Sequence, residues 1–213
     1  MHQCPRNCVC VRGVSLTRSL SSGSCTCNPS SDTGAKPPLW FGLQAVIEAG
    51  DAVIYPDPGF PSYKNSIIAF GGVPRPVPLN EAGSSFDMDA LRAALEPRQD
   101  FLMESKARVI LMNSPSNPTG GVMGDDELQA IAELAIEHDC IVISDEIYSR
   151  LVYGGGQKPG GILEIPGMRE RSIVVDGFSK TFCMTVRQLI GNLARMRCFR
   201  SRFSERNVHE EKL

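Results

Sequence analysis

Lys180 is the residue with the clearest potential for covalent chemistry. It lies between Ser179 and Thr181, shortly after the apolar β-branched run 173–175. A lysine amine with its ordinary pKa of about 10.4 is protonated and a poor nucleophile. In a cationic or desolvated pocket it loses the proton and can form a Schiff base with an aldehyde. A lysine after a strand is more often a solvated surface residue, so neighbouring residues must support a chemical role.

Two further polar segments follow strand-like runs. Residues 113–121 follow the run 109–112, and residues 144–148 follow the run 141–143. An Asp at a strand end can simply cap the next helix, and Asn-Pro-Thr-Gly is also good turn chemistry. However, parallel α/β sheets bind ligands beyond the carboxyl ends of their strands. Three polar segments after three strands therefore predict one active-site rim.

The elements that position these segments alternate between strand and helix patterns. Strands are expected at 51–55, 73–77, 108–112, 141–144 and 172–175, and helices at 36–50, 62–70, 87–95 and 125–138. This alternation implies a largely parallel sheet covered on both faces. The expected fold class is α/β, with three α/β/α layers and a mostly parallel central sheet.

The order of these motifs resembles the class I/II aminotransferases, which are fold-type-I pyridoxal-phosphate (PLP) enzymes. The resemblance runs from about Thr33 to about Thr185. It implies an incomplete large, PLP-binding domain at 33–185, with a non-family leader at 1–32 that we expect to be unstructured and a divergent tail at 186–213. It also implies PLP as cofactor, an amino acid and a 2-oxo acid as substrates, and a homodimer.

The resemblance assigns roles to four polar side chains. Lys180 of the Ser-Lys motif holds PLP as an internal aldimine and shuttles a proton at the substrate α-carbon. Asp145 of Asp-Glu-Ile-Tyr keeps the pyridine nitrogen protonated, so that the ring acts as an electron sink. Tyr148 and Asn117 donate to the phenolic oxygen of the cofactor. Lys180, Asp145 and Tyr148 are the candidate catalytic residues.

The remaining cofactor contacts come from two other segments. Phe60 corresponds to the family aromatic that stacks on the pyridine ring, and we interpret the nearby Tyr63 as structural. The turn before the first helix resembles the family's phosphate-binding turn, because a helix N-terminus attracts anions. Gly34 and Ala35 would offer backbone N–H groups, and Lys36 adds positive charge. Ser179 is a further phosphate candidate.

The agreement with the family ends shortly after Thr185. Arg187 arrives one residue earlier than the family's phosphate-binding arginine, and the Gly-Trp pair that usually precedes that arginine is absent. We expect Arg187 to serve as the phosphate cation. We expect no counterpart of the family's N-terminal arm and small domain within these 213 residues. One alternative to an aminotransferase is a PLP-dependent C–S lyase, because the same cofactor residues serve both reactions. The other is a truncated, non-catalytic fragment that at best binds PLP.

Composition excludes several other classes. The chain has 213 residues and a net charge of -2, so no basic excess suggests nucleic acid. No apolar run approaches membrane-spanning length, and residues 1–20 lack a secretory apolar segment, so we expect a cytoplasmic protein. No Gly-x-Gly-x-x-Gly follows a strand, which argues against a dinucleotide site. Five cysteines in the first 27 residues allow a zinc site, but Cys-x-Cys is not the usual Cys-x-x-Cys spacing of such sites. The Ser- and Thr-rich stretch 15–31 favours an unstructured leader.

Overall fold

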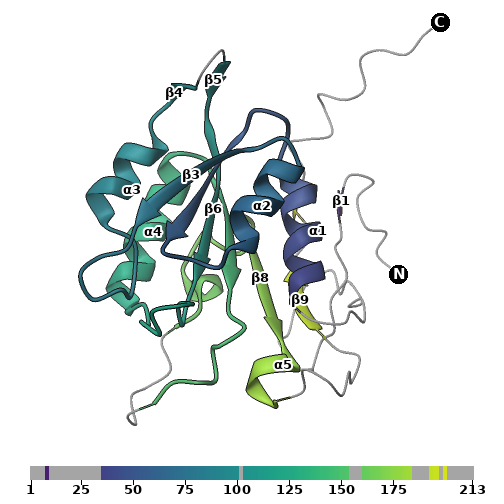
Figure 1. The fold of residues 1–213 in the computed structure, drawn as a ribbon, viewed down its shortest axis with the longest axis vertical. Helices are drawn as coiled ribbons and strands as arrows, with labels where there is room; N and C mark the ends of the chain where they lie inside the picture. The colour runs from purple at the N-terminus through teal and green to yellow at the C-terminus, as the bar shows by residue number, and fades with distance from the viewer. Residues whose placement is uncertain are drawn as a thin grey trace, which may run out of the picture.

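The computed structural model describes residues 8–9, 35–100, 103–153, 160–183, 192–196 and 199–200. Its centre is a six-stranded sheet with the strand order β3-β2-β6-β7-β8-β9 (Figure 1). The first five strands of this order run parallel, and β9 pairs antiparallel with β8. The expected three-layer α/β/α architecture with a mostly parallel central sheet is confirmed.

The strands of this sheet are β2 (Ala52–Asp57), β3 (Val73–Pro78), β6 (Ala107–Asn113), β7 (Ile141–Asp145), β8 (Ser172–Gly177) and β9 (Asn192–Met196). Two small sheets accompany it: β4 (Arg98–Asp100) with β5 (Met103–Ser105), and β1 (Cys8–Val9) with β10 (Phe199–Arg200). The helices are α1 (Lys36–Val46), α2 (Ser62–Ala69), α3 (Met88–Leu95), α4 (Asp125–Glu137) and the short α5 (Phe178–Thr181), with a 3₁₀ turn at Ile162–Glu164.

The helices cover the two faces of the sheet in pairs. Helices α1 and α2 lie on one side and α3 and α4 on the other (Figure 1). Successive strand residues point to opposite faces. In β7, Val142 therefore packs into the core cluster with α4, whereas Ile143 packs into the cluster with α1 and α2. The sheet is buried on both faces, as its nearly continuous apolar strands require.

The prolines of β3 are explained by its place at the edge of the sheet. Pro74, Pro76 and Pro78 alternate along this strand, which pairs only with β2 among the described strands. Their ring nitrogens share one side of the strand, away from the β2 ladder, so no ladder hydrogen bond is lost. These prolines also protect the exposed edge from pairing with another chain.

The end of the first helix and the end of β2 differ from the sequence expectation. The first helix ends at Val46 rather than at Gly50, because Ile47 adopts an extended conformation and Asp51 Oδ2 accepts a hydrogen bond from the Glu48 N–H. Strand β2 continues through Pro56 to Asp57, where a loop was expected. The proline is tolerated because the pairing of β2 with β6 reaches only Ile54, so this end of β2 pairs with β3 alone.

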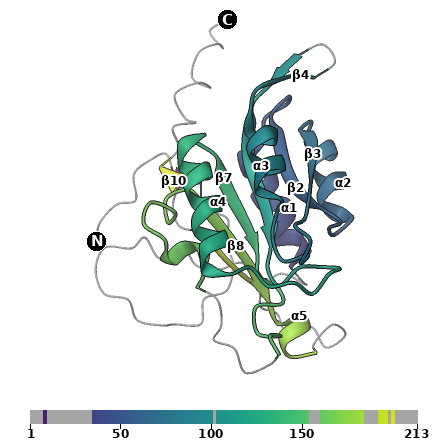
Figure 2. The same cartoon turned by 90° about the vertical axis from the view of Figure 1, so that its left-hand side faces the viewer.

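The carboxyl ends of the parallel strands lie at one end of the molecule, where α5 follows β8 (Figure 2). None of the helices in the described ranges combines the length and apolar character needed to cross a bilayer.

Candidate active site

A cavity of about 610 Å³ opens beyond the carboxyl ends of β6, β7 and β8. Every predicted site residue within the described part of the chain lines it, although the residues come from five separate segments. The lining comprises Ala35, Lys36, Pro37, Leu39, Phe60, Tyr63, Asn113, Asn117, Asp145, Ile147, Tyr148, Ser179 and Lys180. The volume is typical of a site for a small organic molecule.

Asp145 is the buried acid of this cavity. It is the last residue of β7, and only 6% of its surface is exposed. Its Oδ2 accepts a hydrogen bond from the Tyr63 hydroxyl at 2.7 Å, and its Oδ1 accepts from the Ile147 N–H at 3.3 Å. Burial raises the pKa of the Asp145 carboxyl to about 6, although the two hydrogen bonds oppose the shift. A carboxyl with this pKa can exchange its proton near neutral pH.

Asn113 connects the ends of two neighbouring strands. Its Nδ2 donates to the backbone carbonyl of Asp145 at 2.8 Å, and its Oδ1 accepts from the Asn117 N–H at 2.7 Å. The amide side chain thus satisfies one backbone group on each side, as a buried polar group must. It fixes the start of the Asn117 loop relative to Asp145.

Lys180 and Tyr148 face each other across the cavity. Lys180 lies in α5, immediately after β8, and its Nζ is 5.6 Å from the centre of the Tyr148 ring. Tyr148 follows β7 by three residues and lies in a turn closed by the hydrogen bond that the Ser149 N–H donates to the Glu146 carbonyl at 2.8 Å. An ammonium over an aromatic ring is attracted by the ring's quadrupole. The cavity therefore holds an amine and a phenol close to a buried carboxyl.

Lys36 and Phe60 form another part of the wall. Lys36 begins α1, and its Nζ is 5.4 Å from the centre of the Phe60 ring. Phe60 contacts the ring of Tyr63 edge-on, with centres 5.5 Å apart. Ala35 caps α1, whose N-terminus opens on the cavity. A helix N-terminus with an adjacent lysine attracts anions.

Two predicted site residues, Gly34 and Arg187, lie outside the described residues. Among the leader cysteines, only the backbone of Cys8 is described, in β1.

The sequence interpretation missed the parts played by Tyr63 and Asn113. Tyr63 was expected to be structural, yet its hydroxyl reaches the Asp145 carboxyl. Its place in the first turn of the helix expected at 62–70, three residues after Phe60, was a usable signal, because the start of this helix lies close to the Phe60 segment. Asn113 ends β6 in the same register as Asp145 in β7, but strand register cannot be obtained from one sequence.

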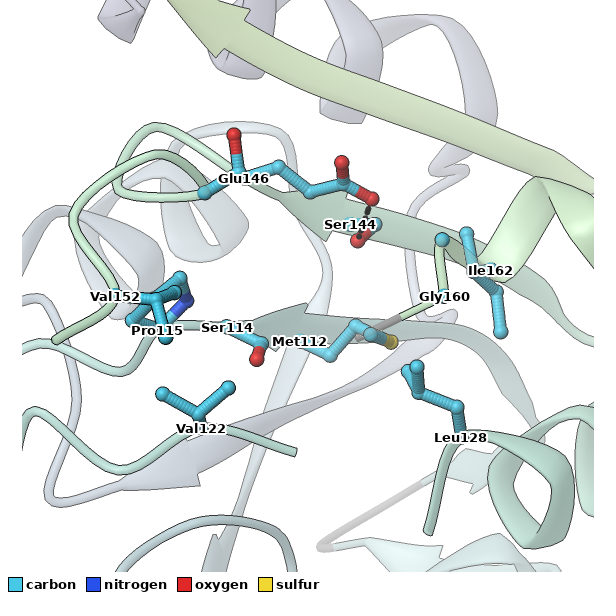
Figure 3. A pocket seen from close by; sticks show the side chains of 12 residues that line it. Met112, Ser114, Pro115, Val122, Leu128, Ser144, Glu146, Val152, Gly160 and Ile162 are labelled. Carbon is cyan, nitrogen blue, oxygen red and sulfur yellow. Dashed lines mark hydrogen bonds between the residues drawn. The ribbon is translucent and has the colours of Figure 1, made fainter. Parts of the chain in front are cut away.

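A second hollow lies on the α4 face of the sheet, between Met112, Leu128 and the hydrogen-bonded pair Ser144 and Glu146 (Figure 3). Its volume is about 30 Å³, which suffices for about one water molecule. It is too small for a cofactor, so the larger cavity is the candidate site.

Comparison with known proteins identifies relatives of this chain in one enzyme family. A family profile described as "Aminotransferase class I and II" matches residues 25–187. The chain is 40% identical over 152 residues to an aspartate aminotransferase of Pyrococcus abyssi, and 36% identical over 152 residues to aromatic-amino-acid aminotransferase 2 of Thermococcus litoralis. Each alignment covers 71% of this chain but 37% of the relative, so the chain spans little more than a third of their length.

A solved structure supports the same relationship. The crystal structure of an aromatic aminotransferase from Pyrococcus horikoshii matches with a TM-score of 0.66 and 36% identity, covering 77% of this chain and 42% of that one. At 36% identity, the two chains are similar in amino-acid sequence as well as in fold. The chain therefore belongs to the class I and II aminotransferases, a family whose members depend on PLP.

Proposed function

We propose that this chain binds PLP in the 610 Å³ cavity, and that the enzyme it forms moves an amino group from an amino acid to a 2-oxo acid. The observation that carries the proposal is the buried Asp145 carboxyl, which lines the same cavity as the amine of Lys180. When bound, PLP supplies an aldehyde for amine exchange and a pyridinium ring that withdraws electrons from the substrate α-carbon.

The residues of the cavity fit each polar part of PLP. Asp145, with its pKa near 6, can hold a proton on the pyridine nitrogen, and the Tyr63 hydroxyl keeps the carboxyl oriented. Asn117 and Tyr148 carry donors suited to the phenolic oxygen. Phe60 offers a ring face for stacking, worth about 1 kcal/mol beyond burial.

Lys180 is the proposed covalent anchor and the residue that moves a proton at the substrate α-carbon. A lysine amine could do both, because in its neutral form it is a nucleophile toward an aldehyde and also a general base. Tyr148 is close enough to influence the ammonium through its ring. Asp145 would orient the pyridine ring and keep its nitrogen protonated, so Lys180 and Asp145 have separate tasks.

The phosphate of PLP is proposed to bind at the N-terminus of α1. The backbone N–H groups of Gly34 and Ala35 and the ammonium of Lys36 supply the attraction, with Ser179 and Arg187 as further donors. Support comes from Ala35, Lys36 and Ser179, which line one cavity although more than 140 positions separate Ser179 from the other two.

The proposed substrates follow from the relatives, which are named for transfer of amino groups from aspartate and aromatic amino acids. A dicarboxylic or an aromatic amino acid is therefore the first donor to test, with a 2-oxo acid as acceptor. No feature of the described site favours a C–S lyase over a transaminase.

The test separates cofactor attachment from turnover. The purified chain is incubated with PLP, its visible spectrum is recorded, and the adduct is reduced with borohydride and mapped by peptide mass. We expect the modified peptide to contain Lys180. Aspartate or phenylalanine is then added before reduction, and loss of the visible band with formation of the 2-oxo acid indicates transamination. A folded chain that gains no PLP label would contradict the proposal.

The proposed assembly is a homodimer located in the cytoplasm. Trp40 and Phe41 on α1 are 40% and 45% exposed beside an apolar groove between α1 and α2, next to the cavity. Exposed aromatic side chains around such a groove are typical of subunit interfaces.

Cys140 and Cys183 are both free, as is usual in reducing compartments. Light scattering at several concentrations tests the dimer, and cell fractionation tests the compartment.

A further inference from the structure

We propose that Glu127 is a positioning residue for the cofactor site, acting on Asn117 through the loop formed by residues 80–84. This inference rests on the proposed binding of PLP. Glu127 lies in the first turn of α4, outside the cavity, so it acts only through the residues it holds.

The two carboxylate oxygens of Glu127 face different partners. Oε2 accepts from the backbone N–H of Gly124 at 2.7 Å, which closes the N-terminus of its own helix. Oε1 accepts from Asn80 Nδ2 at 2.9 Å and from the Ser84 hydroxyl at 3.0 Å. One half-buried side chain therefore connects α4 to the loop after β3.

The 80–84 loop is itself a compact turn. Asn80 Oδ1 accepts from the Ser84 N–H at 3.0 Å, and the Asn80 carbonyl accepts from the Gly83 N–H at 2.8 Å. Gly83 has a φ of +64°, which favours glycine. The carbonyl of Gly83 is thereby directed toward the neighbouring Asn117 loop.

The contact between the two loops is close and polar. The Thr119 hydroxyl donates to the Gly83 carbonyl at 2.6 Å. A Cβ added at Gly121 would lie 2.2 Å from the same carbonyl oxygen, so backbone packs directly on backbone here. Any displacement of residues 80–84 must therefore be transmitted to residues 119–121.

Residues 116–121 in turn form one closed turn that contains Asn117. Ser116 N–H donates to the Gly121 carbonyl and Gly120 N–H to the Ser116 carbonyl, each at 2.8 Å. The Asn117 N–H is held on its inner side by Asn113 Oδ1. Asn117 is thus held directly by Asn113 on the sheet side. Gly83 contacts Thr119 and Gly121 of the same turn, and Glu127 acts on that turn only through the 80–84 loop.

The test uses Glu127→Gln, because a glutamine has one acceptor oxygen where the carboxylate has two. The variant can accept from Gly124 or from the 80–84 loop, but not from both. Asp126→Asn, which removes an exposed charge from the same helical turn, is the matched control. The swapped double variant Asn80→Asp with Glu127→Gln restores the bridge, since the glutamine amide can then donate to the new carboxylate.

The first measurement is amide hydrogen exchange of the chain without cofactor. Glu127→Gln should speed exchange of the Asn117 and Gly120 amides about tenfold, since a lost hydrogen bond to a charged group loosens the loop by that order. Asp126→Asn should leave these amides unchanged, and the double variant should recover most of the protection. Equal exchange in Glu127→Gln and the unmodified chain would overturn the inference.

The second measurement is the pH at which the PLP–lysine chromophore changes colour. Loss of the Asn117 hydrogen bond to the phenolic oxygen should raise this midpoint by about one pH unit, which a general loss of stability would not do. An unchanged midpoint in Glu127→Gln would contradict a positioning role. If the unmodified chain forms no chromophore, the proposed function fails, and the exchange measurement still decides whether Glu127 holds the loop.

Discussion

The hydroxyl of Tyr63 donates a hydrogen bond to Oδ2 of Asp145 at 2.7 Å, although 82 positions separate the two residues in sequence. Tyr63 is fully buried and Asp145 nearly so. The bond connects the first turn of α2 to the end of β7, and it stabilises the ionised carboxylate. Burial and the nearby carboxylate raise the pKa of the Tyr63 hydroxyl, so the phenol stays protonated and remains a donor.

Replacing Tyr63 with phenylalanine should destabilise the protein more at high pH than at low pH. At pH 8 the ionised Asp145 loses a partner, at a cost of about 1–3 kcal/mol, whereas below pH 5 the carboxyl is protonated and the cost is smaller. Urea unfolding of Tyr63→Phe at pH 4.5 and pH 8 measures both values. Tyr55→Phe, at a buried tyrosine of β2, is the control. An equal loss at the two pH values would show that the hydrogen bond does not favour the ionised form.

Replacing Asp145 with asparagine should stabilise the cofactor-free protein at high pH. Burial raises the folded-state pKa of Asp145 from 3.8 to about 6, so the carboxyl favours folding below pH 4 and progressively loses that effect as the pH rises through 6. An asparagine does not titrate. Relative to the unmodified protein, Asp145→Asn should therefore gain about 3 kcal/mol between pH 4 and pH 8.

Thermal unfolding between pH 4 and pH 8, without PLP, follows this difference. A stability gap between Asp145→Asn and the unmodified protein that stays constant with pH would argue against a raised pKa. With PLP present, the order should reverse at pH 8, because the variant cannot neutralise a protonated ring nitrogen.

Replacing Lys180 with alanine should abolish covalent attachment of PLP. No other residue of the described cavity except Lys36 carries a primary amine, and Lys36 lies over the Phe60 ring at the N-terminus of α1. Borohydride reduction followed by peptide mass mapping gives the readout. Lys64→Ala, an exposed lysine of α2, should keep the full label. An undiminished label in Lys180→Ala would assign the attachment to another lysine.

Two glycine-to-alanine substitutions should change stability in opposite directions. Gly42 lies inside α1, and its added Cβ would be 3.7 Å from Ile173, an ordinary contact. Gly42→Ala should stabilise by about 0.5–1 kcal/mol through helix propensity. Gly121→Ala places its Cβ 2.2 Å from the Gly83 carbonyl oxygen and should destabilise the protein by about 1–3 kcal/mol. Urea midpoints of both variants test the pair, and a stable Gly121→Ala would mean that the two loops separate easily.

Local patterns were sufficient to predict most helices and strands. Helix α4 was expected at 125–138 and is observed at Asp125–Glu137, because its apolar stripe and acidic first turn are both signals within one segment. The end of α1 was wrong by four residues, since Ile47 leaves the helix to enter the turn that precedes β2. Such boundaries depend on where the next element must begin, which local periodicity does not encode.

The candidate site divides in a similar way. Lys180, Asp145 and Asn117 could be named in advance because each belongs to a motif of the aminotransferase resemblance. Each motif also follows an apolar run, and the carboxyl ends of parallel strands converge. Arg187 and Gly34, named from the same resemblance, stay predictions, since they lie outside the described residues.

The sequence by itself determined the strand–helix order, the motif residues and the family resemblance, because these depend on residue types at short spacing. Only the tertiary structure decided that Tyr63 meets Asp145, that Asn113 connects β6 to β7, and that Glu127 reaches the 80–84 loop. Each of these contacts joins residues from different elements. Their formation depends on strand register and on the packing of helices over the sheet, and a single sequence specifies neither through any local signal.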